Sequence, residues 1–251
     1  MFLVLFLFKL QAQTEQSNLF DDYWKIGLSF NRDLRFVNNE NNSVDYKIEN
    51  IKSIDLGLVW NYHQWQNHNL KLQLRYSLFP YYFKDSYEIK EEDAYLGFAK
   101  HTELFTLYNE FKIAPTYEYM LPLKNNYLVI GVGPQVSYML TTGRINYGLT
   151  ALSTNLPDQQ DVIGVEYETN INNEFLYGVI GNVGFIVPTK IGVFNLNVHG
   201  HLGFNKYFET EVNTYNLIVS PDTSSSHDMN NHYIGLGLNY YPKRKSKKII
   251  D

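Results

Sequence analysis

Two histidines are the residues of this chain whose type and spacing best suit chemistry. His199 and His201 stand two positions apart, so that on a strand both would point to the same side, about 7 Å apart. Such a pair could share a metal ion with a carboxylate such as Glu118, or supply a general base. Because no serine lies within two residues of either histidine, the sequence favours a hydrogen-bonded interior pair, and we predict no catalytic residue and no metal site.

Charged side chains recur on the same face of the segments around these histidines. If the segments close into a narrow barrel, opposite charges on the inward face would pair and offset part of their desolvation cost. The predicted polar network of the lumen is Lys25, Asp55, Lys71, Arg75, Glu110, Lys112, Glu118, His199 and His201. An eight-stranded barrel has room for side chains and little else, which favours a plug of salt bridges over the alternative, a gated polar core or proton path.

The elements that position these residues are strands, because apolar and polar residues alternate with a period of two. Eight such segments follow one another from Tyr23 onward. They cover about 24–31, 54–63, 70–78, 103–120, 128–138, 175–187, 194–204 and 234–240. Each would present one apolar face and one polar face.

The connections between these segments alternate in length. Short polar turns are expected at 66–69, 122–126 and 188–191, and long polar stretches at 37–52, 81–102, 141–174 and 207–231. An up-and-down barrel would place the long loops at one end and, with an even number of strands, both termini at the other. The predicted fold class is therefore all-β: a transmembrane up-and-down antiparallel β-barrel of eight strands, with long loops at one end and short turns at the other.

Composition excludes several other classes of protein. The 251 residues are 44% hydrophobic and 19% charged, which is enough to form one folded domain. A net charge of −5 offers no basic surface along the main body for nucleic acid. No cysteine is present, which excludes disulfides and thiolate metal sites, and no run of roughly 20 apolar residues could form a spanning helix. We expect no cofactor.

The first ten residues, MFLVLFLFKL, form a short apolar run followed by a small residue at Ala12. This length suits the hydrophobic region of a signal peptide, and a buried N-terminal strand is the alternative. We therefore predict a signal peptide at 1–12 and an N-terminal periplasmic segment at 13–22. The barrel would occupy 23–241, and a basic C-terminal tail 242–251.

A soluble ligand-binding barrel would show the same alternation with its two faces exchanged. The predicted strands are long enough to cross a bilayer at a tilt, which takes roughly 9–11 residues. Aromatic residues also gather toward strand ends, as they do at membrane interfaces. The predicted interface aromatics are Trp24, Trp60, Tyr62, Tyr117, Tyr119 and Tyr240. Apolar residues are therefore expected to face lipid.

The last predicted strand, IGLGLNYY at 234–241, is similar to the C-terminal assembly signal of outer-membrane barrels. From Tyr23 to Tyr241 the chain resembles the eight-stranded outer-membrane barrel proteins of Gram-negative bacteria, OmpA and OmpX in shape, and the PorT-like family in particular. It departs from the pattern by continuing beyond the terminal aromatic with Pro242 and the basic tail. The resemblance implies a place in the cell outer membrane with both termini periplasmic. It also implies insertion by the β-barrel assembly machinery, and contact with outer-membrane lipid and lipopolysaccharide.

We predict a structural or interaction protein of the bacterial envelope, with a lumen filled by side chains. Loops on a rigid barrel are where binding usually resides, so an envelope protein partner is expected at 141–174 and 81–102. By resemblance to PorT-like barrels, this partner would belong to a secretion or assembly complex.

Two other functions stay open. A lipid A-modifying barrel enzyme, an acyl hydrolase or transferase, would use His199 or His201 as its base. It would need that histidine and a nucleophile within about 3 Å of each other at the membrane rim. A small-solute channel would need a continuous wet path past Arg75 and Glu118.

Overall fold

The computed structural model describes residues 19–36, 38–40, 51–81, 84–91, 94–102, 106–140, 143–152, 161–171, 173–216 and 223–244. The predicted signal peptide and the last seven residues of the basic tail lie outside these ranges. Within them, no helix is long and apolar enough to cross a membrane. The described residues form fifteen strands, β1 to β15.

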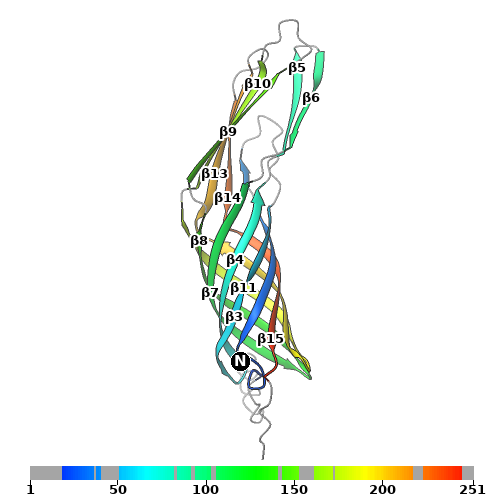
Figure 1. The fold of residues 1–251 in the computed structure, drawn as a ribbon, viewed down its shortest axis with the longest axis vertical. Helices are drawn as coiled ribbons and strands as arrows, with labels where there is room; N and C mark the ends of the chain where they lie inside the picture. The colour runs from blue at the N-terminus through cyan, green and yellow to red at the C-terminus, as the bar shows by residue number, and fades with distance from the viewer. Residues whose placement is uncertain are drawn as a thin grey trace, which may run out of the picture.

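Eight of these strands close into one barrel, in the order β1-β15-β12-β11-β8-β7-β4-β3 (Figure 1). Their bounds are β1 Ile26–Arg35, β3 Ile51–Trp65, β4 His68–Tyr81, β7 Thr106–Leu123, β8 Asn126–Met139, β11 Phe175–Pro188, β12 Gly192–Gly203 and β15 Tyr233–Pro242. Every neighbouring pair is antiparallel, and the first and last strands close the ring with Leu28 opposite Tyr240. The predicted eight-stranded antiparallel barrel is confirmed. A bridge between Tyr23 and Lys243 holds the two ends of the described chain at the same mouth.

The stretches predicted as long loops contain the remaining seven described strands. These are β2 Asn38–Glu40, β5 Lys84–Glu91, β6 Ala94–Thr102, β9 Gly143–Leu152, β10 Asp161–Ile171, β13 Lys206–Asn216 and β14 Thr223–Asn230. They pair as a five-stranded sheet, β2-β14-β13-β10-β9, and a separate β5-β6 hairpin, which extend beyond one end of the barrel (Figure 1). The sequence TSSSHDMN of β14 lacks the apolar alternation that marks a half-buried strand, so periodicity did not predict this strand, whereas residues 162–169 of β10 do alternate.

Contacts near the base of the five-stranded sheet tie its strands together. Lys206 on β13 lies 2.5 Å from an Asp228 carboxylate oxygen and 2.7 Å from one of Glu209. These hydrogen bonds, to Asp228 and then Glu209, raise the pKa of Lys206 above its usual value. Between β10 and β13, the hydroxyls of Thr169 and Thr210 lie 3.0 Å apart. The sheet is therefore linked by side chains as well as by its backbone ladder.

The opposite end of the barrel is made of short reversals. The β3–β4 and β7–β8 turns are two residues long, and their first residues, Gln66 and Lys124, have φ of 48° and 49°. Between β11 and β12, the Thr189 hydroxyl donates to the Gly192 carbonyl at 2.7 Å. These three turns therefore add little chain beyond the barrel strands that they connect.

The barrel wall has the opposite distribution of polar and apolar side chains from the wall of a soluble barrel. Along β1, every second residue is buried, and the residues between them are exposed or half-exposed. Except for Arg32, the outward positions are apolar, as at Leu28 (62% exposed), whereas the buried ones include Asn31, Asp33 and Arg35. A soluble barrel would place its apolar residues inside, whereas β1 turns its polar side chains toward the core and most of its apolar side chains toward the surface.

Candidate functional site

The interior of the barrel is the candidate site, because it gathers charged side chains from four strands and two histidines from a fifth. Eight of the nine residues predicted for the lumen lie there, each at most 4% exposed: Asp55, Lys71, Arg75, Glu110, Lys112, Glu118, His199 and His201. The ninth, Lys25, is exposed, because it precedes the first residue of β1 and lies at the barrel mouth.

Lys112 on β7 is the centre of a first charge cluster. Its Nζ lies 2.7 Å from a carboxylate oxygen of Asp55, 3.0 Å from one of Asp33 and 3.2 Å from one of Glu110. The same ammonium lies 4.6 Å from the centre of the Tyr233 ring, a cation–π geometry. Carboxylates from β1, β3 and β7 thus share one cation, and a single lysine cannot neutralise them.

Two arginines supply the missing positive charge. Arg35 pairs with Glu110, and an Nη atom of Arg75 lies 3.6 Å from a carboxylate oxygen of Asp55. Arg75 also donates to the side-chain oxygen of Gln135 at 2.7 Å. The cluster therefore holds three cations and three carboxylates, so that pairing offsets part of the cost of burying them.

A second, smaller cluster lies nearer the short turns. Lys71 on β4 pairs with Glu118 on β7. The same carboxylate accepts hydrogen bonds from the side-chain amides of Asn69 at 3.0 Å and Asn182 at 3.2 Å. Asn69 donates further to the side-chain oxygen of Asn61 at 2.8 Å. The buried Glu118 carboxylate therefore has both an opposite charge and amide partners.

The two histidines belong to this interior network. His199 Nε2 lies 2.8 Å from a carboxylate oxygen of Asp33, and His201 Nδ1 lies 2.6 Å from the backbone oxygen of Asn231. A Cβ at position 235 would sit 2.2 Å from the Asp33 oxygen and 2.7 Å from His199 Nε2, so Gly235 leaves the space that this pair occupies. The histidines are 3% and 4% exposed and lie inside the barrel, away from the rim where a lipid-modifying enzyme would need them.

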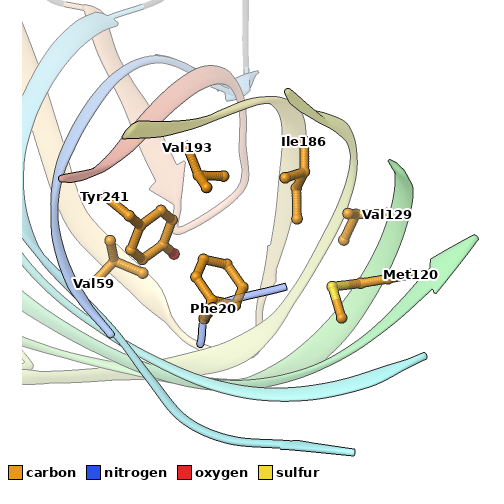
Figure 2. Close-up of a cluster of buried hydrophobic side chains, with 7 residues drawn as sticks. All are labelled: Phe20, Val59, Met120, Val129, Ile186, Val193 and Tyr241. Carbon is orange, nitrogen blue, oxygen red and sulfur yellow. The ribbon is translucent and has the colours of Figure 1, made fainter. Parts of the chain in front are cut away.

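An apolar cluster fills the barrel at the end where the termini meet (Figure 2). It consists of Phe20, Val59, Met120, Val129, Ile186, Val193 and Tyr241. Phe20 belongs to the stretch predicted as a periplasmic segment, yet it is 2% exposed and its ring lies 4.9 Å from that of Tyr241. Residues of the N-terminal segment therefore fold back into the barrel mouth and close it.

Aromatic side chains close the interior at the other end. The guanidinium of Arg35 lies 4.4 Å from the centre of the Phe79 ring and 5.2 Å from that of Tyr207. Tyr207, on β13, also donates its hydroxyl to Glu110 at 3.4 Å. Its neighbour Phe208 stacks on Tyr108 with 5.9 Å between ring centres. The projecting sheet thus contributes the cover of the charge cluster.

Phe20→Ala is expected to destabilise the barrel by about 3 kcal/mol, because the truncation removes a buried aromatic ring and leaves a cavity. Phe20→Leu should lose clearly less, since it keeps most of the apolar contact. The measurement is urea unfolding in lipid vesicles, followed by tryptophan fluorescence. Equal stability of Phe20→Ala and the wild type would mean that the N-terminal segment does not seal the mouth.

The outward face carries two sets of aromatic side chains. The predicted set lies at the end of the termini and short turns: Trp24, Trp60, Tyr62 and Tyr117 are exposed, and Tyr119 and Tyr240 are partly buried. At the other end, three further pairs form between neighbouring strands: Tyr76 with Phe111, Tyr138 with Phe175, and Tyr177 with Phe204. Between the two sets, the exposed residues are mostly leucine, isoleucine and valine.

Sequence reasoning missed several members of the charge cluster. Asp33 and Arg35 continue the inward alternation of β1 past the predicted strand end at residue 31. Tyr233 precedes the predicted last strand by one residue, and Tyr207 lies in a predicted loop. The signal for Asp33 and Arg35 was that they follow Asn31 at alternate positions, on the same face of the strand. It was obscured because Arg32 interrupts the apolar face between them.

In both clusters, the positive and negative side chains neutralise one another. Each carboxylate of the first cluster already faces a cation, and the one carboxylate of the second is shared by a lysine and two amides. Among the residues with described positions, no group of three or more His, Asp or Glu side chains is arranged to hold a metal ion. Arg75 and Glu118, which a wet path would have to pass, are 2% and 1% exposed. The arrangement braces the strands against one another and fills the lumen.

Comparison with known proteins finds similar folds only. No family model matches the chain, and no curated protein matches it. Solved structures similar to it include the outer membrane protein OprG from Pseudomonas aeruginosa, with 9% identity, a TM-score of 0.42, and 88% of this chain and 98% of that one covered. The outer membrane protease OmpT from Escherichia coli has 10% identity, a TM-score of 0.34, and coverage of 90% and 99%. At such identities the likeness is one of fold alone.

Proposed function

We propose that the protein is an outer-membrane β-barrel that acts as a structural or interaction protein of the bacterial envelope. The observation that carries this proposal is the inverted wall: paired charges fill the interior, while residues such as Leu236 (66% exposed) and Val132 (53%) cover the outside. In water such a surface would aggregate. In a bilayer it is the surface that a barrel needs, because the closed ring satisfies its backbone hydrogen bonds internally.

The dimensions of the apolar band support the same proposal. From Phe175 to Phe185, β11 would rise about 23 Å along the barrel axis, at about 3.3 Å per residue and a tilt of about 45°. Transmembrane barrels carry an apolar band about 25 Å tall between two aromatic girdles. Phe175 belongs to the second aromatic set described above, and Phe185 lies toward the short-turn end of β11, so the calculated height agrees with that of a transmembrane barrel.

The proposed orientation assumes that a signal peptide at residues 1–12 directs export of the protein. Both termini and the short turns would then lie in the periplasm, and β5, β6, β9, β10, β13 and β14 would project outside the cell. The edge of the five-stranded sheet at β9 offers backbone groups to which a partner strand could pair. A partner at 81–102 and 141–174 therefore fits the proposal, and a PorT-like role in secretion or assembly stays a prediction.

The alternative functions have less support from the geometry. A lipid-modifying enzyme would need its histidine at the rim, whereas His199 and His201 are buried in the lumen. A channel would need an open interior, and a soluble ligand-binding barrel an apolar one. Side chains fill the described lumen, and most of those between its two ends are charged or polar.

The test of the proposal is gel migration of protein extracted from membranes in mild detergent, with and without boiling. We expect the protein to require detergent and to migrate differently when unboiled, because a closed barrel with buried ion pairs should resist the detergent until it is heated. Release into aqueous buffer, with the same migration before and after boiling, would contradict the proposal and favour a soluble barrel.

A further inference from the structure

Two basic residues interrupt the apolar outer surface of the barrel. Among the described outward positions of the barrel strands, Arg32 on β1 and Lys52 on β3 are the charged ones, and both are exposed. A charge on the lipid-facing side of a membrane barrel is costly unless it lies near an interface or is paired. Their presence together on neighbouring strands therefore requires an explanation.

The strand register brings these two side chains next to each other. Arg32 lies opposite Ile54 on β3, and Lys52 lies opposite Leu34 on β1, so the two cations are diagonal neighbours on the same face. Such neighbours are roughly 7–8 Å apart, a spacing that a guanidinium and a lysine side chain can both bridge to one anion. Lys52 is the second residue of its strand, which puts the pair toward the end of the barrel that carries the projecting strands.

No described acidic side chain neutralises this pair. The nearest carboxylate in sequence is Asp33, which is 1% exposed and points into the lumen, where it binds Lys112 and His199. Both cations thus face outward without a described protein anion. An external anion would lower the cost of keeping them there.

An apolar groove of about 460 Å³ runs beside the two cations. Its lining includes Leu34, Val198, Ile234 and Leu236 in addition to the two basic residues and Asp33, which is 1% exposed. Gly200 lies opposite Ile234, and a Cβ there would meet nothing closer than 3.9 Å, so the wall next to the groove is also open. Two cations beside an apolar groove match a ligand with an anionic head and a hydrocarbon chain.

We propose that Arg32 and Lys52 bind the phosphate of a membrane lipid headgroup, while an acyl chain of the same lipid lies in the groove along Val198 and Leu236. Arginine suits this role because its planar guanidinium can donate two hydrogen bonds to one phosphate. This inference rests on the proposed membrane location. In that orientation the lipid belongs to the outer leaflet, where phosphorylated, multiply acylated glycolipid is the main lipid.

The test uses native mass spectrometry of the full chain in detergent, titrated with bis-phosphorylated lipid A. The variant is Arg32→Gln with Lys52→Gln. The matched control is Lys25→Gln with Lys124→Gln, which removes the same charge from exposed positions at the opposite end. We expect the variant to bind about thirtyfold more weakly, because two charges at about 1 kcal/mol each amount to about 2 kcal/mol, and the control to bind like the wild type. The wild type should bind dephosphorylated lipid A as weakly as the variant binds the phosphorylated form.

The outcomes separate this inference from the proposed function. Each protein is also run boiled and unboiled on the same gel. If the wild type shows the heat shift but the Arg32→Gln/Lys52→Gln variant binds lipid A as tightly as the control does, the lipid site is overturned and the membrane barrel is retained. Equal binding of phosphorylated and dephosphorylated lipid would overturn the site as well. If the wild type shows no heat shift and needs no detergent, both proposals fail.

Discussion

Lys112→Met is expected to destabilise the folded barrel by about 3–5 kcal/mol, the cost of removing one partner from a buried ion cluster. Lys112 is the cation shared by Asp33, Asp55 and Glu110. Methionine fills a similar volume but leaves three carboxylates with two arginines in a space closed to water. Urea unfolding in lipid vesicles measures the loss, and the heat-shifted band should disappear at a lower temperature.

The matched control for this prediction is Lys25→Met, because Lys25 is the predicted lumen residue that the structure leaves exposed. It should change stability by no more than about 0.5 kcal/mol. Combining Lys112→Met with Asp55→Asn should lose less than the sum of the two single changes, since the second removes a carboxylate that the first leaves uncompensated. A Lys112→Met variant as stable as the Lys25→Met control would show that the cluster does not brace the barrel.

Val132→Arg is expected to cost about 2–4 kcal/mol if the outer surface faces the middle of a bilayer. Val132 lies in the middle of β8, points outward and is 53% exposed. In a protein surrounded by water, the same substitution at an exposed position would change stability by about 0.5 kcal/mol or less. The sign and size of the change in unfolding free energy therefore show whether the outer surface of the barrel contacts lipid or water. The measurement is unfolding in vesicles, together with the yield of folded protein.

Leu123→Arg is the control for Val132→Arg. Leu123 is also exposed, at 42%, but it is the last residue of β7 and lies beside a two-residue turn. Near the interface an arginine can reach the headgroups, so we expect a cost of about 0–1 kcal/mol. Equal effects of the two substitutions would contradict the proposed membrane orientation of the wall.

The sequence predicted the interior well where the alternation is uninterrupted. Lys71, Arg75, Glu110 and Lys112 occupy inward positions of two long strands, and simple parity assigned them to one face. Prediction was poorer where a charged residue on the outward face interrupts the alternation of apolar and polar residues. Arg32 breaks the apolar face of β1, so parity gave no support for extending the strand to Asp33 and beyond.

Other parts of the candidate site were beyond the reach of periodicity. Phe20 precedes the first strand, and only the folded chain brings it within 4.9 Å of the ring of Tyr241, more than two hundred residues away in sequence. Tyr207 lies in a stretch whose polar composition indicates a loop, yet it covers Arg35. Both residues act by closing an end of the barrel, which is a property of the complete ring.

Alternation is a local property, because each residue of a strand turns its side chain to the side opposite its neighbour's. The sequence by itself therefore determined that the barrel strands have one polar and one apolar face, and their number and the short turns indicated an up-and-down barrel. Which charges meet depends on register between distant strands, since shifting one strand by one residue would turn its whole set of side chains to the other face. Only the tertiary structure decided that Lys112 lies among Asp33, Asp55 and Glu110, and that Arg32 and Lys52 share the outer wall.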